Sequence, residues 1–167
     1  MQPVNRARGF TLLEVLIAIL VFSMGLLGAA SLMVLSVRTN HSAYLRTQAS
    51  FLAEGMADRI RTNLGWAEDY NGDYDSGTAG AGTCPSNVCS PADLVTRDTE
   101  IWSQQLVDFL PAATASINCA GSGASPAHRG TQPFNGLCTI IINWTEADLS
   151  RTAGTPATQT FAWVFQP

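Results

Sequence analysis

Glu14 is a carboxylate at the entrance of a long apolar segment, and a carboxylate in that position needs a chemical reason. No charged residue occurs from Val15 to Val37, which is 23 consecutive positions. As a helix these positions would extend roughly 34 Å, enough to cross a bilayer. A charge at its edge costs about 2.5–3.5 kcal/mol on insertion scales, so we expect Glu14 to have a partner and a function. Arg6 and Arg8 precede the segment and favour a cytoplasmic N-terminus by the positive-inside rule.

Four cysteines are the next groups with a definite chemistry, and all of them follow the apolar segment: Cys84, Cys89, Cys119 and Cys138. An even number of cysteines on the oxidising side of a membrane indicates two disulfides, which can be connected in three ways. We favour Cys84–Cys89 and Cys119–Cys138 because nearest-neighbour pairing closes short loops. A zinc site of four thiolates is the alternative. Zinc ligands usually come as two close pairs, whereas Cys119 and Cys138 are 19 positions apart, so we expect no metal here.

An acidic stretch over residues 69–75 places oxygen-bearing side chains at alternate positions, as a calcium loop would: Asp69, Asn71, Asp73 and Asp75. The agreement with an EF-hand is poor. Glycine stands at the fourth position instead of the sixth, and the twelfth position is Gly80 instead of glutamate. We predict a solvated turn and no cofactor, with calcium binding as the alternative.

The two histidines offer little support for catalysis. His41 lies on an expected exposed helix and His128 in a glycine-rich loop. No Gly-x-Ser-x-Gly, His-Glu-x-x-His or Walker glycine loop occurs. We therefore predict no catalytic residues, and an exported enzyme tethered by its helix is the less favoured class.

The charge balance argues against nucleic-acid binding. All nine basic residues are arginine, against thirteen acidic residues, for a net charge of −4. Removal of Arg6 and Arg8 would leave seven against thirteen, a net charge of −6. Tight binding to nucleic acid requires many neutralised phosphates, so we expect no intrinsic nucleic-acid binding.

One long helix must position the N-terminal residues. Beyond Arg38, apolar residues recur at spacings of 4, 3, 4 and 4: Leu45, Ala49, Leu52, Met56 and Ile60. This spacing predicts one apolar stripe on a helix. The helix is expected from near Phe10 to near Asn63, with residues 15–37 spanning the membrane and the second half amphipathic.

The remaining residues predict a small α+β head, in which an antiparallel sheet packs on the amphipathic half of the long helix. Phe161, Trp163 and Phe165 are expected on one face of the last strand. The expected elements are a loop over 64–91, a helix over 98–110 capped by Asp98, a loop over 120–133, and strands over 139–144 and 161–165.

The N-terminal residues resemble the class III signal of the type IV pilin family. The resemblance lies in the basic leader, the Gly9-Phe10 pair, Glu14 and the uninterrupted apolar run. It implies that a prepilin peptidase cuts after Gly9, that Phe10 is then N-methylated, and that Glu14, fifth in the mature chain, is the assembly residue. The implied divisions are a leader over 1–9, the long helix over 10–63 and a periplasmic or extracellular head over 64–167.

Two simpler interpretations compete with a prepilin signal. One is a secretory signal peptide cleaved near Gly28–Ala30, and the other is a plain membrane anchor. A secretory signal leaves Glu14 unexplained and needs a shorter apolar run than the one present. A plain anchor makes the Gly9-Phe10 pair a coincidence.

The resemblance extends to minor pilins through Gly25–Ala29 and Met56–Asn63. It implies a low-abundance structural subunit that helps prime a type IV pilus and sits at or near the tip. The implied partners are other minor and major pilins, the prepilin peptidase, the inner-membrane assembly platform, inner-membrane lipid and a tip adhesin. The implied location is the inner membrane before assembly and the pilus, at the cell surface, afterwards. A minor pseudopilin of type II secretion, which shares the signal, is the alternative.

Overall fold

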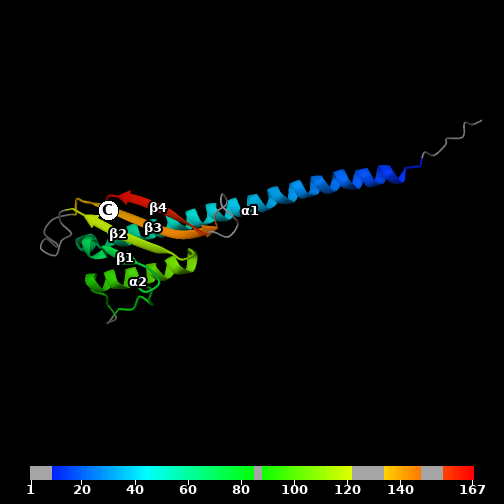
Figure 1. Cartoon of the computed structure of the whole chain (residues 1–167). Coiled ribbons are helices and arrows are strands. Elements are labelled where there is room, and N and C mark those ends of the chain that lie inside the picture. The colour runs from blue at the N-terminus through cyan, green and yellow to red at the C-terminus, as the bar shows by residue number, and fades with distance from the viewer. Residues whose placement is uncertain (1–8, 85–87, 122–133, 148–155) are drawn as a thin grey trace, which may run out of the picture. The chain divides into compact units, whose positions relative to one another are not determined.

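The computed structural model describes residues 9–84, 88–121, 134–147 and 156–167 (Figure 1). The chain divides into an N-terminal unit that ends at His41 and a head unit that begins at Ser42. The elements are α1 (Leu12–Thr62), the 3-10 helix η1 (Leu64–Tyr70), β1 (Gly72–Tyr74), α2 (Pro91–Phe109), β2 (Thr114–Ala120), β3 (Leu137–Ala147) and β4 (Pro156–Phe165).

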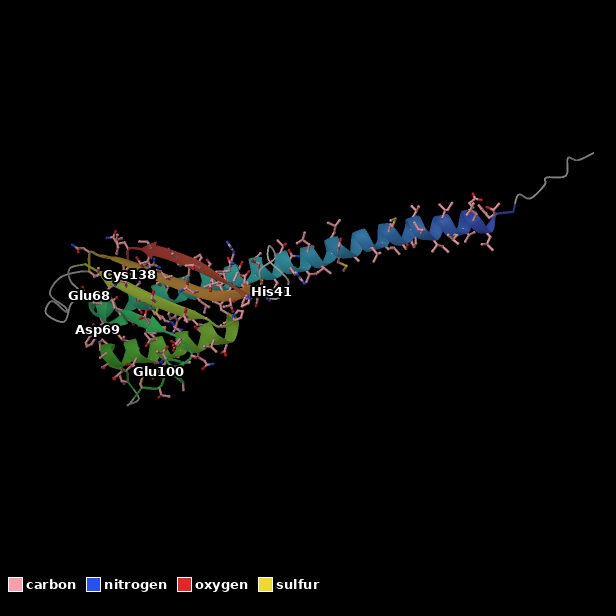
Figure 2. All side chains as sticks on the ribbon, in the orientation of Figure 1. His41, Glu68, Asp69, Glu100 and Cys138 are labelled. Carbon is pink, nitrogen blue, oxygen red and sulfur yellow. A yellow bond between two sulfur atoms is a disulfide. The ribbon has the colours of Figure 1, made fainter. Side chains whose placement is uncertain are left out.

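The N-terminal unit is the first part of α1, and its side chains are exposed on every side (Figure 2). Its mean hydropathy reaches 2.5 in an 18-residue window, so the helix is long and apolar enough to cross a membrane. The hydroxyls of Ser23, Ser31 and Thr39 donate to helix carbonyls three or four residues earlier, at 2.8–2.9 Å. These polar groups are therefore satisfied without water, as a lipid environment requires.

The second part of α1 forms one wall of the head, as the periodicity predicts. All five residues of the predicted stripe are buried, with at most 7% of any side chain exposed. Ala53 and Ala57 are also fully buried, which widens the stripe. The predicted helix is confirmed to within two residues at each end.

The head is built on a four-stranded antiparallel sheet with the order β1-β2-β3-β4. The β2–β3 register runs from Thr114 opposite Asn143 to Ala120 opposite Leu137. The β3–β4 register runs from Cys138 opposite Phe165 to Ala147 opposite Pro156. The predicted α+β class is thus confirmed, and both predicted strands exist but are longer than expected.

Phe161, Trp163 and Phe165 do lie on one face of β4, which is the less exposed face of that strand. Phe165 is buried, and the other two are partly buried against the core. The prediction that this aromatic face belongs to the core is confirmed.

Two strands were missed by the sequence analysis. β2 was not predicted, although Ala115, Ile117 and Cys119 alternate with exposed or half-buried residues and point into the core. The predicted loop over 64–91 is wrong in part, because η1 and β1 lie within it. The side chains of β2 are mostly small, so its hydrophobic alternation is weak. The three residues of β1 are too few to show a period. The expected loop over 120–133 begins with the last residue of β2, and 122–133 lie outside the described residues.

The start of α2 was also placed wrongly. The helix begins at Pro91, seven residues before the expected cap Asp98, which lies inside it. The true N-cap is Ser90, whose hydroxyl accepts from the Asp93 N–H at 3.2 Å while the Asp93 carboxylate accepts from the Ser90 N–H at 3.0 Å. This is a capping box with proline at the first helical position, a signal that the sequence contains.

Trp102 fixes α2 against α1. Its side chain is almost fully buried, and its Nε1–H donates to the Leu52 carbonyl oxygen at 2.8 Å. Its ring meets Tyr74 edge-on, with the centroids 5.6 Å apart. One aromatic side chain thus links α1, α2 and β1.

Met56→Ala should lower the free energy of unfolding of the head by about 2–5 kcal/mol, because Met56 is fully buried and the change leaves a cavity. Urea denaturation of the full chain in detergent micelles, followed by tryptophan fluorescence, measures the change. Phe51→Ala is the matched control on the same helix, since Phe51 is 62% exposed, and it should cost less than about 0.5 kcal/mol. Equal losses would contradict the packing described here.

Candidate functional site

The predicted processing and assembly residues lie at the start of α1. Gly9 and Phe10 precede the helix and are exposed. Thr11 immediately precedes the helix and caps it, since the Glu14 N–H donates to the Thr11 carbonyl at 3.1 Å and to the Thr11 hydroxyl at 3.2 Å. The peptide bond between Gly9 and Phe10 therefore lies in exposed, non-helical chain, which is the form that a peptidase can accept.

Glu14 lies in the first turn of α1, where a carboxylate is favoured by the partial positive charge of the helix N-terminus. Its side chain is exposed in the single chain. Gly9, Phe10 and Glu14, the residues predicted for cleavage, methylation and assembly, thus lie close together in the chain at the start of α1.

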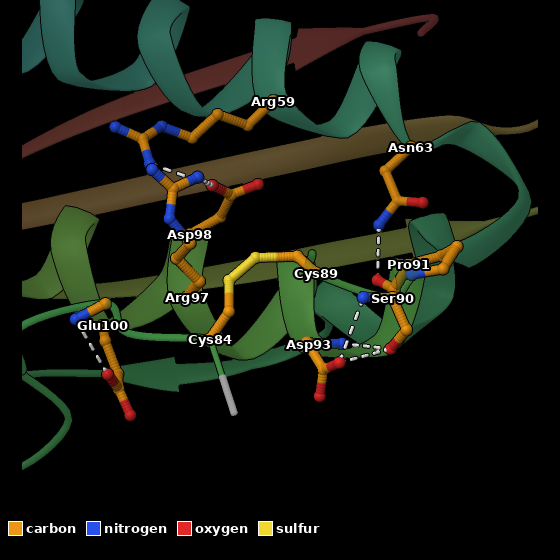
Figure 3. Close-up of a disulfide and its surroundings, with 11 residues drawn as sticks. Arg59, Asn63, Cys84, Cys89, Ser90, Pro91, Asp93, Arg97, Asp98 and Glu100 are labelled. Atoms are coloured by element: carbon orange, nitrogen blue, oxygen red, sulfur yellow. Dashed lines mark hydrogen bonds and ion pairs between the residues drawn. A yellow bond between two sulfur atoms is a disulfide. The ribbon is translucent and has the colours of Figure 1, made fainter. Parts of the chain in front are cut away.

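The four cysteines form two disulfides at separate places in the head. Cys119 and Cys138 are directly opposite each other in β2 and β3, inside the core (Figure 2). Cys84 and Cys89 are bonded across five positions just before α2, with their Cα atoms 5.4 Å apart (Figure 3). No cysteine is free, which leaves no thiolate for the alternative zinc site.

The acidic stretch over 69–75 is exposed at Asn71, Asp73 and Asp75, as predicted, but it contains a strand where the sequence predicts a turn. Residues 72–74 form β1, and Tyr74 is buried. The Asn71 side chain is occupied by β2, since its Nδ2 donates to the Cys119 carbonyl at 2.9 Å and its Oδ1 accepts from the Cys119 N–H. Asp75 accepts from the Gly77 N–H at 2.7 Å in a tight turn. Within the described ranges, no three acidic, histidine or cysteine side chains are grouped to hold a metal ion.

A buried polar network that the sequence analysis missed lies between α1, η1 and α2. The Asp98 carboxylate accepts from Arg59 at 3.1 Å and from the Tyr70 hydroxyl at 3.1 Å. The Asn63 Nδ2 group donates to the Pro91 carbonyl at 2.9 Å and lies 3.3 Å from the Tyr70 hydroxyl. The hydrogen-bond partners of Asp98 are 28 and 39 positions away, so no local pattern reveals them, and only the weaker ion pair with Arg97, at 3.9 Å, is local. The network links α1, η1 and α2 within the head.

Burial changes the acidity of two tyrosines in this region. Desolvation raises the pKa of Tyr70 to about 12, and the nearby Asp98 carboxylate acts in the same direction. Desolvation also raises the pKa of Tyr74 to about 12. Hydrogen bonds from the Ser90 hydroxyl and N–H lower the pKa of Asp93 at the start of α2.

Residues 4–30 match the family model of the prokaryotic N-terminal methylation motif. The chain carries a prepilin signal. The match includes Gly9, Phe10 and Glu14 and the first part of α1. It supports a type IV pilin or pseudopilin-like protein, and with the fold it points to a structural protein rather than an enzyme. No curated protein and no solved structure matches the chain.

The motif implies processing by a prepilin peptidase and assembly with other pilins. An N-terminal apolar helix behind such a signal is consistent with membrane anchoring and with a place on a pilus surface. Pilins and pseudopilins share this motif, so the match does not distinguish one kind of protein from the other.

Asp98→Asn should destabilise the head by about 1.5–3 kcal/mol, because it removes the negative charge that pairs with a largely buried Arg59. Asp58→Asn is the matched control. Asp58 pairs with Arg61 at 2.7 Å, but its side chain is 74% exposed, so its loss should cost at most about 0.5–1 kcal/mol. Urea denaturation of both variants in the same micelles gives the comparison, and a ranking in the opposite order would refute the role assigned to Asp98.

On the alkaline side of neutrality, the free energy of unfolding should change little up to about pH 10 and fall between about pH 10 and 12. The unfolded chain releases the phenolic protons of Tyr70 and Tyr74 near pH 10, while the folded head holds them to about 12. The chain has no lysine, and all four cysteines are in disulfides, so few other groups titrate in this range. Urea midpoints at pH 8, 9.5 and 11 measure the fall, and Tyr74→Phe should reduce its slope. A midpoint that rises with pH would contradict this assignment.

Proposed function

We propose that this protein is a minor pilin of a type IV pilus, most similar to the minor pilin PilV. It is a low-abundance structural subunit that helps prime pilus assembly and sits at or near the tip. One observation carries the proposal: the methylation motif over residues 4–30 leads directly into a helix whose first part is apolar on every side. Gly25–Ala29 and Met56–Asn63, which resemble minor pilins, favour this member of the family.

Processing creates the assembly group. Residues 1–9 are the leader, and cleavage after Gly9 leaves the amine of Phe10 as the new N-terminus, which is then methylated. Residues 10–63 become the helix of the mature subunit, and 64–167 its periplasmic or extracellular head. The methylated amine remains cationic, so the mature chain has one positive and one negative group at the same end of α1.

Glu14 selects the register of docking. Its carboxylate pairs with the Phe10 amine of a neighbouring subunit inside the membrane. Attraction between unit charges is strong in a low dielectric, and an unpaired charge there is costly. A subunit that docks one helical turn too high or too low would leave two charges unpaired, so the pair discriminates against wrong registers.

The apolar part of α1 serves two environments in turn. In the inner membrane, with a cytoplasmic N-terminus, its side chains contact lipid. In the pilus they contact the helices of other minor and major pilins. Because the hydroxyls of Ser23, Ser31 and Thr39 are already bonded within the helix, these three groups keep their partners when the helix moves from lipid to protein. The assembly platform of the inner membrane carries out this transfer, and a tip adhesin is a further partner of the assembled subunit.

A minor pseudopilin of type II secretion is the second candidate, because the motif over residues 4–30 suits it equally. The two functions differ in where the mature subunit is found. A pilus subunit leaves the cell body within an external filament, whereas a pseudopilin stays in the envelope.

Mechanical shearing of filaments from the native cells, followed by mass spectrometry of the N-terminal peptide, tests the proposal. Methylated Phe10 in the sheared fraction is the expected result. Methylated Phe10 found in the envelope fraction and missing from sheared filaments would favour the pseudopilin, and an intact Met1 leader would overturn both. Gly9→Val is the control and should abolish the mature peptide. A Cβ at Gly9 meets nothing within 4 Å, so this change tests recognition by the peptidase and not folding.

Glu14→Ala should be processed and methylated normally, yet fall at least about tenfold in the sheared fraction, because the Phe10 amine of the neighbour then has no partner. Quantitative mass spectrometry of membrane and filament fractions measures both effects. Glu54→Ala removes an exposed carboxylate from the head part of α1 and should be incorporated normally. Normal incorporation of the Glu14→Ala variant would refute the register mechanism.

A further inference from the structure

The two disulfides of the head differ in how easily a reagent can reach them. Cys119 and Cys138 are 2% and 0% exposed and belong to the core between the sheet and the helices. Cys84 and Cys89 are half-exposed and lie outside that core. Thiol–disulfide exchange requires a thiolate to reach a sulfur atom, so exposure decides which bond reacts.

The exposed disulfide is attached to the N-terminal end of α2. Cys89 immediately precedes the cap residue Ser90, whose hydroxyl and carbonyl accept from the N–H groups of Asp93 and Leu94 (Figure 3). Cys84 ends the segment 75–84, which runs along α2. The bond therefore connects the first turn of the helix to this segment.

The segment 75–84 is held on α2 independently of the disulfide. The Thr78 hydroxyl lies 2.8 Å from that of Ser103, and the Gly82 N–H donates to the Glu100 carboxylate at 3.0 Å. Gly82 has φ +63°, and a Cβ placed on it would collide with the side chain of Ile101. These contacts hold the segment to the middle of α2, so the bond at Cys84 and Cys89 restrains mainly the first turn.

We propose that Cys84–Cys89 is a site of thiol–disulfide exchange with dithiol reductants. It opens while Cys119–Cys138 stays closed, and its opening loosens the first turn of α2 without unfolding the head. The capping box of Ser90 and Asp93 remains as the local restraint on that turn, and it is exposed to water.

The dithiol supplies both electrons that the reduction of the disulfide requires. One thiolate of the reductant attacks Cys84 or Cys89, the S–S bond breaks, and the displaced cysteine takes up a proton. The second thiol of the reductant loses its proton and attacks the reductant's other sulfur, which is part of the mixed disulfide. This attack displaces the other cysteine, which takes up a proton. Two electrons pass to the protein: the dithiol ends as a disulfide, and Cys84 and Cys89 end as thiols.

Timed reduction of the full chain in detergent micelles with dithiothreitol tests the selectivity. Free thiols are trapped with iodoacetamide, and peptide mass spectrometry reports each cysteine separately. Cys84 and Cys89 should be labelled at least about tenfold faster than Cys119 and Cys138. Equal rates, or faster labelling of the buried pair, would overturn the proposal.

Hydrogen exchange tests the structural consequence. In the selectively reduced wild type, amide exchange should accelerate over residues 92–95 and stay unchanged over Thr114–Ala120. The double variant Cys84→Ser/Cys89→Ser should reproduce this pattern, and Cys119→Ser/Cys138→Ser is the contrasting control, with faster exchange in β2 and β3. Unchanged exchange at the start of α2 in the reduced wild type would overturn the loosening, and it can be measured even if a variant fails to fold.

Discussion

The structure depends on one constraint: the first part of α1 is apolar on every side and must be kept away from water. An ordinary surface helix buries one stripe and exposes the rest. Here every side chain from Val15 to Val37 is exposed in the single chain, which is consistent with anchoring in a membrane. In the proposed function, the single carboxylate at the edge of this segment favours those arrangements of helices that supply it with a positively charged partner.

The second part of the same helix meets a different requirement. Its buried stripe includes Ala49, Ala53 and Ala57, whose small side chains let the elements of the head pack close to the helix backbone. Two arginine side chains on other sides of the helix also contact the head. Arg46 donates to Gln159 of β4 at 3.1 Å, and the Arg61 guanidinium lies 5.3 Å from the centre of the Phe165 ring. The same helix is thus fully exposed along its first part and forms a wall of the head along its second part.

The parts that the sequence predicts are those with a period or a local signal. The stripe from Leu45 to Ile60, the α+β class and the strands at the C-terminal end follow from spacing and composition. The capping box at Ser90 and Asp93 is equally local, and it shows that the helix begins before Asp98. By contrast, the role of Asp98 depends on Arg59 and Tyr70, which are distant in the sequence, and the role of Asn71 depends on the backbone of β2. Side-chain networks of this kind are decided by the tertiary fold, so no local spacing can predict them.

The restraints on α2 differ along its length, and this follows from where its contacts lie. Its middle is held by the buried Trp102 and by Asp98, both of which reach α1. Its start is held by the capping box, by the bond from Asn63 to the Pro91 carbonyl and by the half-exposed Cys84–Cys89 bond. Removing a buried contact leaves a cavity or an unpaired charge, whereas removing an exposed one allows water to replace it. The start of α2 can therefore loosen while the core stays packed. A loss of packing in the core, by contrast, would disturb the whole head.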